Sequence, residues 1–83
     1  MRPPAEVPAR TELRKRVIAK AIRDFRESLG WSQEAFARAV HTTIRAGTVS
    51  RWEGGQLTPY PTNCRRLYQL ARRLDREDIG FVF

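Results

Sequence analysis

The side chains with the most informative chemistry lie between residues 45 and 51. Two arginines, Arg45 and Arg51, stand on either side of small residues, which are Ala46, Gly47, Thr48 and Ser50. A guanidinium offers a planar fork of N–H donors that fits phosphate oxygens and the O6 and N7 atoms of guanine. Small residues beside such donors let a helix approach a surface closely. We therefore expect hydrogen bonding to a polyanion, with Arg45 and Arg51 as the side chains that reach it.

The charge of the whole chain favours the same kind of partner. The 83 residues carry 16 Lys plus Arg against 9 Asp plus Glu, which gives a formal net charge of +7. All but two of the basic residues are arginine. A chain of this length forms one domain, near the lower size limit for a stable apolar core. The expected partner is double-stranded DNA.

Other chemistries lack the residues that they need. The single cysteine, Cys64, excludes an intrachain disulfide, and with the single histidine, His41, it falls short of a usual zinc site. Paired carboxylates, Ser-His-Asp and Cys-His patterns and phosphate-cradling glycines are missing from the sequence, so we predict no enzyme, no metal and no cofactor. We expect Cys64 to be a small buried apolar residue. Because no apolar run approaches a membrane span and the N-terminus lacks a signal peptide's apolar centre, we expect a cytoplasmic protein.

Helices are predicted to position these side chains. Ile18, Ile22 and Phe25 recur at helical spacing, with Val17 expected beside them on the apolar face. Periodicity and capping residues predict helices at about 11–29, 32–40, 44–53 and 62–74, with Thr11, Ser32 and Thr62 as N-terminal caps and Gly30 and Gly54-Gly55 as stops. The expected fold is all-α, a compact four- to five-helix bundle that contains a helix-turn-helix within residues 11–76.

The two ends of the chain are predicted to differ from this bundle. Residues 1–10 contain Pro3, Pro4 and Pro8 and form a flexible, basic arm in this interpretation. Arg2 and Arg10 allow a contact between this arm and a DNA minor groove. Residues 77–83 form an apolar C-terminal tail, which we expect to pack onto the domain or onto a second subunit.

Several spaced elements together resemble the phage repressor and Cro family of helix-turn-helix DNA-binding domains, also called the Xre family. The resemblance covers roughly residues 18–75. These elements are Phe25-Arg26-Glu27, Gly30, Ser32-Gln33, Phe36-Ala37 and Thr48-Val49-Ser50-Arg51-Trp52-Glu53 with Gly55.

The resemblance implies roles for individual residues. It implies that Arg26 pairs with Glu53, that Gln33 binds a backbone phosphate, and that bases are read from the positions of Ala46, Gly47, Thr48 and Arg51. Arg45 joins this base-reading set because its side chain reaches guanine. Trp52 is expected in the core and Trp31 half-buried. The candidate phosphate contacts are Arg16, Lys20, Arg23, Ser32, Gln33, Thr43, Ser50, Thr62 and Arg65.

The chain departs from the family pattern at the turn. Two more residues than usual lie between Ala37 and Thr48, and Thr42-Thr43 is the natural place for them. His41 then stands where the family has the glycine of the turn. We expect a longer turn and a shifted start of the recognition helix.

The function expected from these observations is a sequence-specific DNA-binding transcriptional regulator. It would be a repressor, encoded by a phage, a plasmid or a small operon, that binds an inverted-repeat operator as a dimer through the major groove. The alternative is a protein-interaction module, such as the antitoxin of a toxin pair, that docks a partner protein and regulates its own operon.

Overall fold

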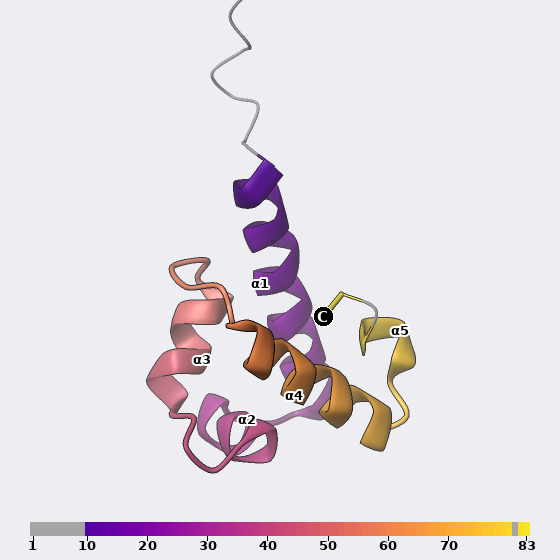
Figure 1. The fold of residues 1–83 in the computed structure, drawn as a ribbon. Coiled ribbons are helices and arrows are strands. Elements are labelled where there is room, and N and C mark those ends of the chain that lie inside the picture. The colour runs from indigo at the N-terminus through magenta and orange to yellow at the C-terminus, as the bar shows by residue number, and fades with distance from the viewer. Residues whose placement is uncertain (1–9, 81) are drawn as a thin grey trace, which may run out of the picture.

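A computed structural model describes residues 10–80 and 82–83, and these residues form five helices (Figure 1). The all-α prediction is confirmed. Residues 1–9 of the predicted arm lie outside the described residues, and Arg10, which was also assigned to the arm, is the first residue of a helix. The helices are α1 (Arg10–Leu29), α2 (Gln33–Val40), α3 (Ala46–Glu53), α4 (Pro61–Arg73) and α5 (Glu77–Gly80).

One apolar core joins the first four helices. Phe25 of α1 and Phe36 of α2 meet edge to face, with ring centroids 5.5 Å apart, and both are fully buried. Trp52 of α3 is 2% exposed, so the prediction that it belongs to the core is confirmed. The core is completed by apolar side chains from each helix and from the turn before α3, among them Ile18, Ile22, Val40, Ile44, Val49, Leu67 and Leu70.

The beginning of α1 extends away from this core, at the top of Figure 1. Leu13 is 54% exposed and Val17 is 50% exposed. The prediction that Val17 lies beside the buried face is therefore wrong. Val17 points about 100° around the helix from the adjacent Ile18, which is 2% exposed, and it lies at the edge of the buried face, where it borders a surface cavity with Leu13 and Val82.

Helix ends follow local backbone preferences. Gly30 ends α1 in the left-handed region at φ 70°, and the Ser32 hydroxyl accepts a hydrogen bond from the Ala35 amide at 3.1 Å, which caps α2. Thr62, expected as the cap of the last long helix, is inside α4, because Pro61 occupies its first position and Tyr60 is the cap. A proline suits this position, where no helical N–H bond is lost.

The C-terminal residues pack onto the domain. α5 lies against α4, and Gly80 is so close to Tyr68 that an added Cβ would meet the ring at 3.3 Å. Ile79, Val82 and Phe83 are partly buried against the core. The segment predicted as an apolar tail therefore begins with a short helix.

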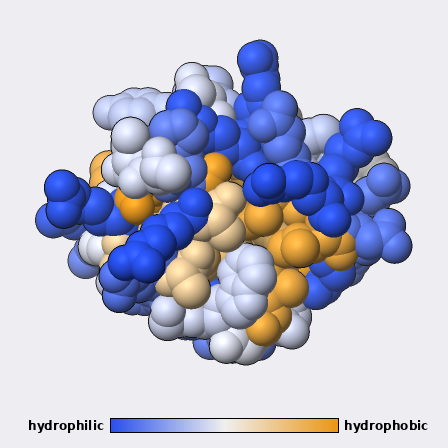
Figure 2. Space-filling model, turned by 90° about the horizontal axis from the view of Figure 1, so that it is seen from below, coloured by the Kyte–Doolittle hydropathy of each residue, from blue (hydrophilic) through white to orange (hydrophobic). Residues whose placement is uncertain are grey.

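Apolar surface also reaches the outside of the bundle. Leu29, Trp31, Ala39 and Leu74 pack against the core but are only partly buried. Figure 2 shows the molecule from below, where apolar surface lies between projecting hydrophilic side chains. Trp31 is half-buried, as expected.

Glu53 at the end of α3 is the buried charged residue on which the arrangement of α1, α2 and α3 depends. Its side chain is 2% exposed. Arg26 donates from Nε to Glu53 Oε2 at 2.6 Å and from Nη2 to Oε1 at 3.0 Å, and Gln33 Nε2 donates to Oε1 at 3.2 Å. Arg23 Nη2 donates to the Glu53 carbonyl at 3.3 Å. Arg26 also donates to the Trp31 carbonyl at 2.9 Å, so one guanidinium joins three segments.

The same contacts keep the carboxylate charged. Burial by itself would raise the pKa of Glu53, but hydrogen bonds from Arg26 and Gln33 and the charges of Arg26 and Arg23 outweigh it, so the pKa lies below the usual value. The hydrogen bond to Glu53 raises the pKa of Arg26 against the effect of burial. Both partners are ionised at neutral pH.

Replacing Glu53 by glutamine should destabilise the fold by about 3 kcal/mol, because the Arg26 charge loses its buried partner. Asp24→Asn is the matched control, since it removes an exposed partner of Lys20 and should cost less than about 1 kcal/mol. Urea unfolding followed by circular dichroism measures both. Equal losses for the two variants would show that the Glu53 network does not hold the helices together.

The lowered pKa of Glu53 also predicts how stability depends on pH. The stabilisation is fully present above the unfolded-state pKa, near 4.5, and is lost as the pH falls through the folded-state value. Between about pH 6 and pH 3, the free energy of unfolding should therefore fall more steeply for the wild type than for Glu53→Gln. Urea titrations across this range give both slopes, and parallel curves would contradict the assignment.

Candidate nucleic-acid interface

One side of α3 packs against the core, and the other side is open to solvent. Val49 and Trp52 are buried, whereas Gly47, Ser50 and Arg51 are exposed. The exposed side also includes Ala46 and Thr48, which are partly buried, and Arg45 just before the helix. Within the part of the chain that the structure describes, the side chains of Arg45 and Arg51 have no hydrogen-bond or ion-pair partner. The structure thus brings together the residues predicted to read bases.

The longer turn between α2 and α3 is accommodated without disturbing the core. Thr42 and Thr43 are exposed, while Ile44 returns to the interior at 8% exposure. The His41 amide ends α2 on the Ala37 carbonyl at 3.0 Å, and the His41 Nδ1 accepts from the Thr43 amide at 3.2 Å. An acceptor Nδ1 places the proton of the neutral ring on Nε2. Thr42 and Thr43, which are predicted to be the extra residues of the turn, therefore lie outside the core beside His41.

The turn also sets where α3 starts. Arg45 has an extended backbone, with φ −106° and ψ 159°, and is the N-cap, so α3 begins at Ala46 rather than at residue 44 or 45. No side chain caps this end. The first amides of α3 are therefore free to donate to an anion.

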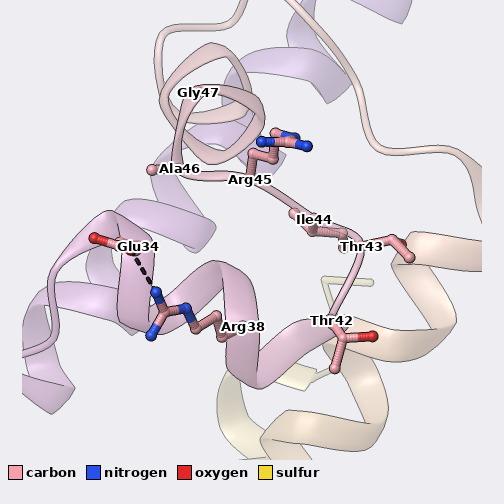
Figure 3. Close-up of a pocket in the computed structure, with 8 residues that line it drawn as sticks. All are labelled: Glu34, Arg38, Thr42, Thr43, Ile44, Arg45, Ala46 and Gly47. Atoms are coloured by element: carbon pink, nitrogen blue, oxygen red, sulfur yellow. Dashed lines mark hydrogen bonds and ion pairs between the residues drawn. The ribbon is translucent and has the colours of Figure 1, made fainter.

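A cavity of about 620 Å³ lies between α2 and the start of α3 (Figure 3). Arg45, Ala46 and Gly47 line its upper part, and the exposed turn residues Thr42 and Thr43 also border it. Glu34 and Arg38 of α2 lie opposite, joined by an ion pair of 2.6 Å. Sequence reasoning did not single out Arg38, although its charge and its spacing of four residues from Glu34 were visible.

The N-terminus of α2 is the second feature of this surface. Ser32 is exposed and uses its hydroxyl to cap the helix. Gln33, which is predicted to bind a phosphate, donates one side-chain N–H to Glu53 Oε1 and so takes part in the Glu53 network. The first backbone amides of α2 have no intrahelical carbonyl to bind, which is the arrangement that binds anions at helix N-termini.

A basic stripe on α1, formed by Arg16, Lys20 and Arg23, lies beside the C-terminal end of α3. Arg16, Lys20 and Arg23 border a cavity with Gly54 and Gly55. Lys20 is paired with Asp24 at 2.7 Å and Arg23 with the Glu53 carbonyl, which leaves Arg16 without an ion-pair partner among the described residues. The stripe is thus partly engaged inside the protein.

Thr62 and Arg65 occupy the first turns of α4 and are exposed. Neither lines the cavity between α2 and α3. Arg65 instead borders a cavity of about 980 Å³ together with His41 and three arginines that are not among the predicted DNA contacts. These are Arg66, Arg72 and Arg73.

Two other kinds of site, a metal centre and a membrane span, are not found in the described part of the chain. No three His, Cys, Asp or Glu side chains there are grouped to hold a metal ion. None of its helices is long and apolar enough to cross a membrane. Cys64 is only partly buried, so the prediction that it is a buried residue is wrong. Its partial burial still raises the pKa of the thiol, although the nearby Arg14 charge lowers it. The thiol is therefore protonated at neutral pH.

Comparison with known proteins agrees with this geometry. A family model described as helix-turn-helix matches residues 22–78, well over half of the chain. Neither the curated proteins nor the solved structures include a significant match. The matched range contains the Glu53 network, the turn and the open side of α3. The chain belongs to the helix-turn-helix family, in its phage repressor and Cro (Xre) type.

Proposed function

We propose that this DNA-binding regulator recognises its sites by placing the N-terminal half of α3 in the major groove. The observation that carries the proposal is the composition of the open side of α3. Between Arg45 and Arg51 the open side carries only the small residues Ala46, Gly47, Thr48 and Ser50, since Val49 is buried, and both guanidinium groups lack partners among the described residues. Forked donors of this kind read the O6 and N7 atoms of guanine.

Gly47 supports close approach to the DNA. An added Cβ at this position would meet no atom within 4 Å, and Gly47 does not have a positive φ. The fold therefore does not need a glycine here, although glycine in a helix costs about 0.5–1 kcal/mol relative to alanine. A surface that must come close to base edges gives a reason for the missing side chain.

Phosphate contacts would fix the orientation of α3. The first-turn amides of α2 near Ser32 and Gln33 would hold one phosphate, and Arg16 beside the end of α3 would hold another. Lys20, Arg23, Thr43, Ser50, Thr62 and Arg65 complete the proposed set as contacts on either side. Gln33 would serve both Glu53 and the phosphate, since its amide group has two N–H donors.

Selective binding requires more base contacts than one copy offers. Each good bidentate contact contributes about 1–3 kcal/mol of discrimination, and α3 presents two arginines for this purpose. Two copies on an inverted repeat, with half-sites about one helical turn apart, would double the contacts. We propose that the protein acts in this way as a repressor.

Arg51→Ala should relax sequence selectivity at one position in each half-site, because one bidentate base contact is lost. Selection from a random DNA library, followed by sequencing, measures the preference at every position. Arg72→Ala is the matched control, since this exposed arginine on α4 is outside the proposed contact set. Identical preferences for Arg51→Ala and wild type would remove Arg51 from the base-reading set.

Gly47→Leu should weaken binding to the selected DNA about tenfold or more while the protein stays folded, because the added side chain meets open space within the protein but fills the approach to the groove. Gly47→Ala should bind nearly normally and gain about 0.5–1 kcal/mol in stability. Fluorescence anisotropy and urea unfolding give both quantities. Normal binding by Gly47→Leu would mean that this face of α3 does not enter the groove.

A further inference from the structure

The exposed apolar residues at the start of α1 form part of a cavity that the DNA proposal does not use. The cavity has a volume of about 500 Å³ and is lined by Leu13, Arg14, Val17, Ile18 and Val82. Leu13 and Val17 are half exposed and four residues apart, so they stand on one side of α1 one turn from each other. Val82 contributes the opposite wall from the C-terminal residues.

A second cavity, of about 650 Å³, adjoins the first through Arg14, which lines both. Its apolar walls come from the beginning of α4 and from the C-terminus, and include Cys64, Tyr68 and Phe83. Tyr68 is 40% exposed. We call the two cavities together the terminal groove. It is an apolar surface that three separate segments assemble.

The charge of the terminal groove is entirely positive. Arg14 and Arg65 are its charged lining residues, and neither has a carboxylate partner within the described part of the chain. Next to Arg14, Lys15 is held by Glu12 at 3.4 Å, whereas Arg16 has no such partner there. An occupant must therefore bring apolar side chains for Leu13 and Val17 and carboxylates for Arg14.

A second copy of this chain does not meet that requirement. The chain carries a net charge of +7, and the side chains around Leu13 and Val17 in α1 are mostly basic. Two such surfaces brought together would place arginine against arginine, and like charges at a protein interface disfavour association. The positive charge of the groove therefore argues against a second copy of the chain as its occupant.

We propose that the terminal groove binds an acidic amphipathic segment of a partner protein. Leu13, Val17 and Val82 receive the apolar side of the segment, and Arg14 pairs with its carboxylates, in the manner of a helix bound in a groove. The groove lies at the start of α1 and the end of the chain, away from the open side of α3. Leu13, Arg14, Val17 and Val82, which receive the segment, are outside the proposed DNA contacts, whereas Arg65 at the other end of the groove belongs to both sets.

The test uses the full chain, labelled with ¹⁵N, and two synthetic peptides of about 15 residues. One peptide carries Leu at helical spacing and Glu at the other positions, and in the second every Glu is replaced by Lys. The acidic peptide should shift the amide signals of Leu13, Val17 and Val82, and the basic peptide should not. Equal binding of both peptides, or shifts that avoid these residues, would overturn the proposal.

Matched variants locate the binding. Leu13→Ser combined with Val17→Ser should weaken binding of the acidic peptide about tenfold or more, whereas Leu57→Ser, which changes an exposed leucine in a loop, should not. Arg14→Glu should abolish binding and Arg51→Glu should leave it intact, although Arg51→Glu impairs DNA binding. This contrast separates failure of the groove from failure of the proposed DNA contact.

Two further results would assign the groove to another occupant. If the wild-type chain is a dimer by sedimentation and the Leu13→Ser, Val17→Ser variant is a monomer, a second copy fills the groove and the proposal is wrong. It is equally wrong if the acidic peptide binds only after deletion of residues 2–9. In that case the chain's own N-terminal segment is the occupant.

Discussion

The buried carboxylate of Glu53 is the constraint around which the recognition surface is arranged. A charge that is 2% exposed persists only with strong partners, and Glu53 obtains them from α1 through Arg26 and from α2 through Gln33. These contacts fix the end of α3 against both neighbouring helices. The apolar side of α3, with Val49 and Trp52, then has one orientation in which it fits the core, and the opposite side is forced outward.

The pairing of charges divides the arginines into two groups. Arg26 and Arg38 each have a carboxylate partner. Arg26 pairs with the buried Glu53, and Arg38 pairs with Glu34 on the surface. Arg45, just before α3, and Arg51, within α3, have no such partner among the described residues, although α3 ends in a glutamate. Glu53, which is in the same helix as Arg51, is buried and pairs with Arg26 and not with Arg51. The same ion pair that holds α3 in place therefore leaves its open side positively charged.

Sequence patterns were sufficient for the parts of the molecule that depend on local preferences and on the spacing of apolar residues. The four long helices and the core position of Trp52 followed from such patterns. They failed for Val17, which is 50% exposed although the adjacent Ile18 is 2% exposed, because helical periodicity does not define how wide a side of α1 is covered by its neighbours. They missed the hydrogen bond from Gln33 to Glu53, since a contact between residues 20 positions apart is decided by packing. The DNA contacts themselves remain predictions.

The turn between α2 and α3 explains why the positions of the two ends of α3 are fixed in different ways. Thr42 and Thr43 bulge into solvent and Ile44 returns to the core, so the extra length is absorbed before Ala46. The end of α3 is meanwhile fixed by Glu53, which makes the positions of Thr48 and Arg51 independent of the turn. Arg45 follows the insertion directly and has an extended backbone, so its direction depends on the bulge. A change in turn length would thus re-aim Arg45 while Arg51 stays in place, which lets one fold alter part of its reading surface without losing the rest.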